Sequence, residues 1–443
     1  MKNSPFQSKG FAALALTLPM ILGGGGGCAS APRPAAGPRT VILSIDALQP
    51  DYYRTGRYET PNLHRLAAQG ASADSVEVIY PSVTYPVHST IVTGAPVEKH
   101  GVISNRVFTW EAGPTYDWYW DASNLKVPAL WDLVSRSGRK VALLGWPVTV
   151  GARADWVVPE VFPPLSFDPG EVWTRTVKVT RPELLAELPP GPFKDTLDRD
   201  RWFARSAELI LEKKSPDLML LHFSHVDVVQ HLQGPGTPAF TRGLADVDSL
   251  LGELVSHLDL SRDCLMVVGD HGFASITRKI RINELFKKQG WLEEIPFKSR
   301  DWKIVGFTSG GQAAIYLKDR SIEKKALQLL RRQAPGNYRI IDRQALDRME
   351  TLPGAWLALE PEEGVAIAQD VKGPFEEKYR EPHGEHGYLP GKSSMETGFI
   401  AAGACAQPGR ELGRMSIYDV AATLAAQAGV RLASDRGRPV PLR

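Results

Sequence analysis

The chain has 443 residues, of which 43% are hydrophobic and 23% are charged, and its formal net charge is +2 at pH 7. This is the composition of a globular protein with enough apolar residues for a large core, either two or three domains or one α/β domain with an insertion. The near-neutral charge excludes the basic footprint of a nucleic-acid-binding protein.

The N-terminus has the pattern of an export signal. Residues 1–27 contain two lysines followed by the apolar run FAALALTLPMIL, which is too short to span a bilayer comfortably. Small residues before Cys28 resemble a bacterial lipoprotein cleavage site, although Gly25 stands where a leucine is usual. A plain signal peptidase site at 29–31 is the alternative. We therefore expect a periplasmic or lipid-anchored protein of the bacterial cell envelope, with a Pro-rich linker over 28–39.

Strand and helix patterns alternate along residues 40–430, which we expect to form the catalytic domain. Alternation of this kind predicts an α/β fold whose sheet is covered on both faces. The break in alternation from about 280 to 380 predicts a smaller insertion. The expected buried strands are 40–48, 140–146, 217–227, 264–272 and 397–403, and the expected helices are 60–70, 127–140, 200–214, 237–258 and 416–429.

Acidic and histidine residues follow several of these strands, which is where open α/β sheets carry their sites. Each has a simpler interpretation: an Asp after a strand often caps a helix, and Asp and His four apart often form a surface pair. His383 we interpret as an ordinary loop residue. The strand-end and loop candidates are Asp46, Asp227, His231, Asp270, His271 and His386.

These candidates supply three carboxylates and three imidazoles, a set that suits two Zn²⁺ ions, each with a position left open. Two such ions can clamp a phosphoryl group, and a hydroxyl bound to one of them becomes a nucleophile near neutral pH. Thr84, in YPSVTYPVHSTIVTG, is the candidate nucleophile. The alternative for Thr84 is a hydroxyl in a turn before a helix.

Two further cysteines, Cys264 and Cys405, lie in apolar, strand-like runs. Their surroundings favour two buried free thiols over a disulfide.

Six motifs in order along the chain resemble the nucleotide pyrophosphatase/phosphodiesterase (type I phosphodiesterase) family of the alkaline phosphatase superfamily. The resemblance implies a three-layer α/β/α sandwich with a mostly parallel sheet and a smaller inserted domain. It also implies two Zn²⁺ per chain, the first held by Asp46, Thr84, Asp270 and His271, and the second by Asp227, His231 and His386. The motifs are ILSIDAL, YPSVTYPVHSTIVTGAPVEKHGVISN, GWPVTV, HVDVVQH, GDHGF and GEHGY.

The resemblance also implies a mechanism. Thr84 would attack the phosphorus and form a covalent phospho-threonine, while the Asn105 amide and the Tyr85 backbone N–H donate to a phosphoryl oxygen. Two departures affect the surroundings: Gln230 replaces a usual glycine, and Tyr85 replaces a common phenylalanine. The Tyr85 ring either stacks on an aromatic group of the substrate or only packs against other residues of the protein.

The expected substrate is a small phosphate diester, such as a nucleotide. Related monoesterases carry a Lys-x-Arg pair after the middle strand, which this chain lacks, although Arg153 could still reach the substrate. Phosphomonoesterase and phosphonate hydrolase remain the alternatives. The aromatic loop 108–124 either lines a base or lipid pocket or is a packed surface loop.

Overall fold

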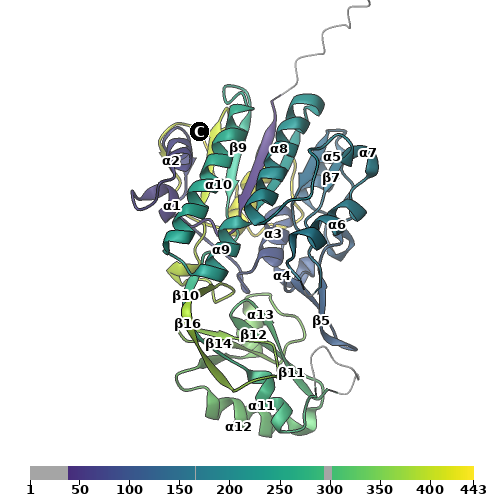
Figure 1. The fold of residues 1–443 in the computed structure, drawn as a ribbon, viewed down its shortest axis with the longest axis vertical. Helices are drawn as coiled ribbons and strands as arrows, with labels where there is room; N and C mark the ends of the chain where they lie inside the picture. Colours follow the sequence, from purple (N-terminus) through teal and green to yellow (C-terminus); the bar gives the residue numbers. More distant parts are fainter. Residues whose placement is uncertain (1–37, 165, 294–301) are drawn as a thin grey trace, which may run out of the picture. The chain divides into compact units, whose positions relative to one another are not determined.

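The computed structural model describes residues 38–164, 166–293 and 302–443, with an eight-stranded sheet at the centre (Figure 1). The strand order is β18-β2-β17-β9-β1-β8-β6-β7. Five neighbouring strands, from β9 to β7, are parallel, and β17 is antiparallel to β9. The strands are β1 (Thr40–Ile45), β2 (Ala71–Ser72), β6 (Val141–Leu144), β7 (Trp156–Val158), β8 (Leu218–Phe223), β9 (Cys264–Val268), β17 (Phe399–Gly403) and β18 (Arg410–Glu411).

Fourteen helices accompany this sheet in the described residues. Several begin at a side-chain cap, as in α8, where the Asp195 carboxylate accepts the backbone N–H of Asp198. The helices are α1 (Asp51–Arg54), α2 (Pro61–Ala68), α3 (Thr84–Thr93), α4 (Val97–His100), α5 (Leu130–Arg136), α6 (Pro169–Val179), α7 (Pro182–Leu185), α8 (Thr196–Lys214), α9 (His225–Gln233), α10 (Pro238–Ser256), α11 (Ile282–Lys288), α12 (Glu323–Gln333), α13 (Arg343–Arg348) and α14 (Ile417–Gln427).

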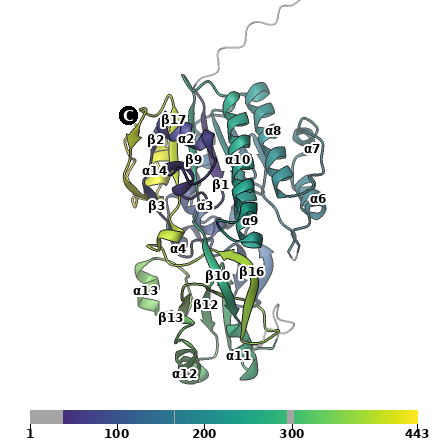
Figure 2. The same ribbon diagram turned by 60° about the vertical axis from the view of Figure 1, so that its left-hand side comes forward.

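The central strands are buried on both faces, because successive side chains point to opposite sides of a strand. Val41 and Leu43 of β1 pack in one apolar cluster with α2, α8 and α10, whereas Ile42 packs in a second cluster with α3, α5 and α14. Helices α8 and α10 lie side by side over the first face (Figures 1 and 2). The fold is therefore the predicted three-layer α/β/α sandwich with a mostly parallel sheet.

A second set of strands lies between β9 and β17 in the sequence. An antiparallel sheet has the order β11-β12-β14-β13 (Figure 1), with α12 between β12 and β13 and α13 between β13 and β14 in the sequence. A three-stranded sheet has the order β15-β10-β16. Two-stranded pairs β19-β3 and β4-β5 complete the strands. These strands are β3 (Ser75–Glu77), β4 (Arg106–Thr109), β5 (Gly113–Trp118), β10 (Ala274–Ile280), β11 (Ile304–Ser309), β12 (Gln312–Leu317), β13 (Tyr338–Ile341), β14 (Leu357–Pro361), β15 (Val365–Ile367), β16 (Glu376–Glu385) and β19 (Arg414–Ser416).

All five predicted strands and all five predicted helices are present, with ends that differ by a few residues. The strands are shorter than their apolar runs. The run 217–227, for example, leaves the sheet after Phe223 and continues into α9. These early strand ends place the polar residues of each run beyond the edge of the sheet.

The expectation of two free thiols is wrong. Cys264 and Cys405 form a disulfide, with their Cα atoms 5.3 Å apart. Cys264 begins β9 and pairs with Gly403 at the end of the antiparallel strand β17, so the turn after β17 brings Cys405 to its partner. The 141 residues that separate the two cysteines hide this proximity in the sequence.

The predicted export signal, Cys28 and most of the Pro-rich linker lie outside the described residues. Within the described part of the chain, no helix combines the length and apolar character that crossing a membrane requires.

Candidate active site

Three strands deliver the predicted acidic residues to one edge of the sheet. β1 lies between β9 and β8, and all three are parallel, so their carboxyl ends meet. Asp46 directly follows β1, Asp270 follows β9, and Asp227 lies in the first turn of α9, just after β8. All three side chains are largely buried, so the simple helix-cap and surface-pair interpretations do not describe them.

Thr84 is the first residue of α3, which begins where the extended residue Val83 ends. The Thr84 hydroxyl lies 3.5 Å from Nε2 of His271. His88, one turn further along α3, holds the backbone here, because its Nδ1–H donates to the Thr84 carbonyl over 2.8 Å and its Nε2 accepts from Ser44. Burial, followed by nearby His222, lowers the pKa of His88 to about 4, which keeps this ring neutral.

A first cluster joins Asp46, Asp270 and His271. The Nδ1–H of His271 donates to the Gly272 carbonyl over 3.1 Å, which leaves Nε2 facing the carboxylates. Nε2 lies 3.3 Å from Asp46 Oδ1 and 3.3 Å from Asp270 Oδ2. Neither of these two buried oxygens has a hydrogen-bond partner among the described residues.

A second cluster joins Asp227, His231 and His386 in the same way. The Nδ1–H groups of the two imidazoles donate to the backbone carbonyls of Gly384 and Ser82, over 3.3 and 3.0 Å. Their Nε2 atoms lie 3.5 and 3.7 Å from Asp227 Oδ1, which is buried and lacks a hydrogen-bond partner among the described residues. The ring of His386 is stacked 3.7 Å from the first cluster's imidazole, so the two clusters are neighbours.

Both clusters fit a divalent metal. In each, the ligand atoms lie within 4.8 Å of one another. Two atoms that each lie about 2.0–2.1 Å from a tetrahedral zinc are roughly 3.3 Å apart, close to the spacings seen here. The histidine tautomers, fixed through Nδ1, leave the Nε2 lone pairs free to bind the ion.

The electrostatics of the clusters also favour cations. Burial raises the pKa of Asp46 well above its usual value, and Asp270 and Asp227 raise it further. Burial lowers the pKa of His386 well below its usual value, and the imidazoles of His271 and His231 add to this effect. The folded chain therefore concentrates carboxylates that repel one another beside a neutral imidazole, and bound dications would relieve that repulsion.

The two residues expected to bind a phosphoryl oxygen lie together beside Thr84. The Tyr85 backbone N–H donates to the Asn105 side-chain carbonyl over 2.9 Å, so it is already engaged in this arrangement. This bond fixes the Asn105 side chain with its amide nitrogen unused by Tyr85. The structure thus brings both predicted residues to the site, with Tyr85 N–H bonded to Asn105.

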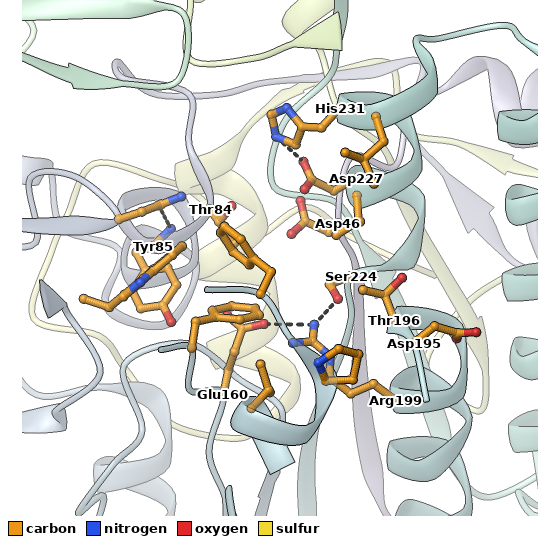
Figure 3. A pocket seen from close by; sticks show the side chains of 18 of the residues that line it. Asp46, Thr84, Tyr85, Glu160, Asp195, Thr196, Arg199, Ser224, Asp227 and His231 are labelled. Atoms are coloured by element: carbon orange, nitrogen blue, oxygen red, sulfur yellow. Dashed lines mark hydrogen bonds and ion pairs between the residues drawn. The ribbon is translucent and has the colours of Figure 1, made fainter. Parts of the chain in front are cut away.

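A cavity of about 370 Å³ opens beside Thr84 and the second cluster (Figure 3). One wall is aromatic: Tyr85 packs against Trp118, and Trp118 packs against Phe162 and Phe167. Phe167, 60% exposed, and Leu232, 64% exposed, lie at the rim. The cavity therefore presents a large apolar surface directly beside the candidate nucleophile.

A second cavity of about 540 Å³ adjoins the first and is more polar. The two share Asn105, Trp118 and His386 among their lining residues. Arg106 and Lys372 supply basic groups to the second cavity. An apolar space and a more polar space thus both adjoin the clusters.

The aromatic loop 108–124 divides between the cavities and the packing of the inserted sheet. Trp118 of β5 lines the two cavities. Phe108 and Trp110 instead pack on the inserted sheet, where Phe108 stacks 3.9 Å from Tyr316. His383 lines neither described cavity; its ring stacks on Tyr379, as suits a structural residue.

Three polar residues near the site were not predicted. His222, inside β8, lies 3.4 Å from Asp46 Oδ2 and 3.4 Å from Glu160 Oε1. Arg199 of α8 pairs with Glu160 and lines the first cavity. No pattern in the sequence distinguishes them, since His222 lies within an apolar strand and Arg199 within a charged helix.

Arg153 is the arginine that we expected could still reach the substrate. Arg153 is exposed and lines neither cavity described above. It lies in the connection between β6 and β7, and the hydroxyl of Ser135 on α5 donates to its backbone carbonyl. The arginine that the fold delivers to the first cavity is Arg199.

Comparison with known proteins agrees with this architecture. Residues 40–389 match the family model of type I phosphodiesterase/nucleotide pyrophosphatase. The chain is 25% identical over 388 residues to an uncharacterised pyrophosphatase/phosphodiesterase of Schizosaccharomyces pombe, covering 82% of this chain and 71% of that protein. It is 23% identical over 260 residues to human ectonucleotide pyrophosphatase/phosphodiesterase family member 5, covering 56% of this chain and 47% of the human protein. A match at 23% identity to venom phosphodiesterase of Naja atra covers 54% of this chain but only 26% of the venom protein.

Among solved structures, murine ectonucleotide pyrophosphatase/phosphodiesterase 5, an inactive form in complex with AMP, superposes with a TM-score of 0.67 at 20% identity, covering 90% of this chain and 97% of that one. This superposition shows an alkaline phosphatase-like α/β sandwich, and the two Asp/His clusters lie at the edge of its sheet. The family model and the curated relatives define a class of metal-dependent hydrolases of phosphoric esters. The chain belongs to the type I phosphodiesterase/nucleotide pyrophosphatase family.

Proposed function

We propose that the protein is a di-zinc phosphodiesterase/nucleotide pyrophosphatase that hydrolyses phosphate diesters through a covalent phospho-threonine at Thr84. The observation that carries this proposal is the pair of buried Asp/His clusters beside Thr84, in which carboxylate oxygens and imidazole nitrogens face one another. Asp46, Asp270, His271 and Thr84 would hold one zinc, and Asp227, His231 and His386 the other. Bound zinc would supply a Lewis acid that neutralises phosphoryl charge and lowers the pKa of a hydroxyl.

Thr84 would act as the nucleophile. Its Oγ1 forms a bond to phosphorus, the bond to the leaving ester oxygen breaks, and that oxygen departs as an alcohol after taking up a proton. Water then attacks the phosphorus of phospho-Thr84, restores the hydroxyl and releases a phosphate monoester. Because α3 begins at Thr84, the positive end of its helix dipole lies beside the oxygens that gain charge.

Asn105 would stabilise the phosphoryl group. Its side-chain carbonyl is held by the Tyr85 N–H, which orients the amide and leaves its N–H groups to donate to a non-bridging oxygen. Donors fixed before the reaction cost no reorganisation when charge develops. The support is the buried position of Tyr85 and the placement of Asn105 in both cavities.

The two cavities support a diester. The apolar cavity suits an uncharged aromatic ester group, against Tyr85 and Trp118, and the polar cavity suits the second ester group. The AMP complex of the murine relative supports a nucleotide-containing substrate. Phosphomonoesterase and phosphonate hydrolase are the alternatives that share these metal ligands.

The test is a comparison of initial rates of the zinc-loaded protein on p-nitrophenyl phosphate, bis-p-nitrophenyl phosphate and p-nitrophenyl-thymidine monophosphate. We expect higher kcat/KM for the two diesters. A higher value for the monoester would make the protein a phosphatase. Turnover of a phosphonate monoester alone would point to the phosphonate alternative.

We also propose that the protein is exported to the bacterial cell envelope, anchored through Cys28. The disulfide between Cys264 and Cys405 supports an oxidising compartment, because such bonds persist outside the cytosol. Palmitate labelling of the full chain should be lost in Cys28→Ala. Equal labelling of both proteins would contradict anchoring at this residue.

A further inference from the structure

Arg199 is a buried cation in the wall of the cavity that contains Thr84. It is 5% exposed and comes from the first turn of α8. Its Nη2 contacts the Ser224 hydroxyl and lies 3.5 Å from Glu160 Oε1, and its guanidinium carbon lies 4.8 Å from the centre of the Phe162 ring. These contacts hold the guanidinium in one position, because stacking on a ring and pairing with a carboxylate both restrict an arginine side chain.

This guanidinium lies close to the metal-ligand clusters. Ser224 directly follows β8, and the preceding Phe223 carbonyl accepts the backbone N–H of Asp46 over 2.8 Å. Ser224 is therefore next to Asp46 across two paired strands, and Figure 3 shows Asp46, Ser224 and Arg199 along one side of the cavity. A phosphoryl group between Thr84 and Asp46 would lie within the reach of this positive charge.

Glu160 compensates that charge. It is 3% exposed, lines the same cavity, and pairs with Arg199 on one side and His222 on the other. The guanidinium is not fully used, because Nε of Arg199 is buried without a hydrogen-bond partner among the described residues. The wall thus holds Arg199 with one N–H group unused. The neighbouring Glu160 carboxylate balances the charge of this arginine.

We propose that the Glu160–Arg199 pair sets the charge preference of this site. With Glu160 present, its carboxylate balances the Arg199 charge that a second phosphoryl charge would otherwise meet, so an ester with one negative charge is favoured over a dianionic monoester. Without the Glu160 charge, Arg199 would bind the additional anionic oxygen as a charge-assisted partner. This inference rests on the proposed function and names the residues that select the diester.

The test uses three variants of the full, zinc-loaded chain: Glu160→Gln, Arg199→Gln and the double variant. The readout is the ratio of kcat/KM for p-nitrophenyl phosphate to that for bis-p-nitrophenyl phosphate, measured on one preparation. The ratio does not depend on the fraction of folded or zinc-loaded enzyme, so partial misfolding does not hide the effect. Glu160→Gln should raise the ratio roughly tenfold or more, the effect of one hydrogen bond to a charged group.

The double variant distinguishes an effect of Arg199 from an effect of His222, the other residue that pairs with Glu160. If Arg199 causes the shift, Arg199→Gln in the Glu160→Gln background returns the ratio to about the wild-type value. If His222 causes it, the double variant keeps the raised ratio, and the proposal is wrong. An unchanged ratio in Glu160→Gln would equally overturn it.

Binding of inorganic phosphate, measured by calorimetry, makes the test independent of turnover. Phosphate dianion should bind roughly tenfold tighter to Glu160→Gln than to wild type, and the double variant should lose this gain. Tighter phosphate binding in a protein that hydrolyses no diester would support the charge pair and contradict the proposed function. Diester hydrolysis with an unchanged phosphate affinity in Glu160→Gln would support the proposed function and contradict the role of the charge pair.

Discussion

Removal of the disulfide between Cys264 and Cys405 should reduce the free energy of unfolding by several kcal/mol. The bridge joins residues separated by 141 positions. In the chain-entropy model, closing a loop of that size lowers the entropy of the unfolded chain enough to stabilise the fold by about 5 kcal/mol. Measured losses of native bridges are often smaller, so we expect a decrease of about 3–5 kcal/mol for Cys264→Ala/Cys405→Ala. Alanine is the suitable replacement, because Cys264 is 2% exposed and a serine hydroxyl would be buried there.

The assay is equilibrium urea unfolding of wild type and the double variant, each with and without reductant. Reductant should destabilise wild type and leave the double variant unchanged, which separates the bridge from the small cavity that alanine creates. Mass spectrometry of a non-reduced digest should find the peptide of Cys264 linked to that of Cys405. A reductant effect below about 1 kcal/mol, with both thiols reactive in the unreduced protein, would refute the reasoning.

Three further predictions concern the site. Asp227→Asn should reduce the zinc content from two ions per chain towards one. If elemental analysis still finds two ions, Asp227 is not a zinc ligand. Zinc binding should weaken as pH falls. Burial lowers the pKa of His231, but Asp227 and Glu385 together raise it above its usual value. The metal-free ring therefore holds its proton at higher pH, and zinc must displace that proton to bind. Chelator competition at neutral and mildly acidic pH measures this, and equal affinities would contradict it. Asn105→Ala should lower kcat/KM for diesters by roughly 10²–10³-fold with unchanged zinc content, so a rate within a few-fold of wild type would exclude the amide as a phosphoryl donor.

Much of the fold could be predicted because it depends on local patterns. The apolar runs that form β1, β8 and β9 are recognisable in isolation, and an aspartate follows each strand closely in the sequence. Parallel strands then place their ends at a common edge, which is why Asp46, Asp227 and Asp270 meet. His386 follows no apolar run, and its signal in the sequence was weaker: a loop histidine beside Glu385 and glycines.

The remaining features depend on contacts between distant segments. Arg199 lies 39 positions from Glu160, and the disulfide spans 141 positions, so neither pair leaves a local signal. The histidine at position 222 is masked by the apolar strand that surrounds it. Strand order decides these contacts, and order was not deducible from periodicity.

The most direct test of the central claim is the rate of bis-p-nitrophenyl phosphate hydrolysis by wild type and Thr84→Ala at matched zinc content. Thr84→Ser, which retains a hydroxyl, is the control. We predict that Thr84→Ala shows no turnover above the uncatalysed rate while its thermal unfolding stays close to that of wild type, and that Thr84→Ser retains activity. Turnover by Thr84→Ala at the wild-type rate would show that Thr84 is not the nucleophile.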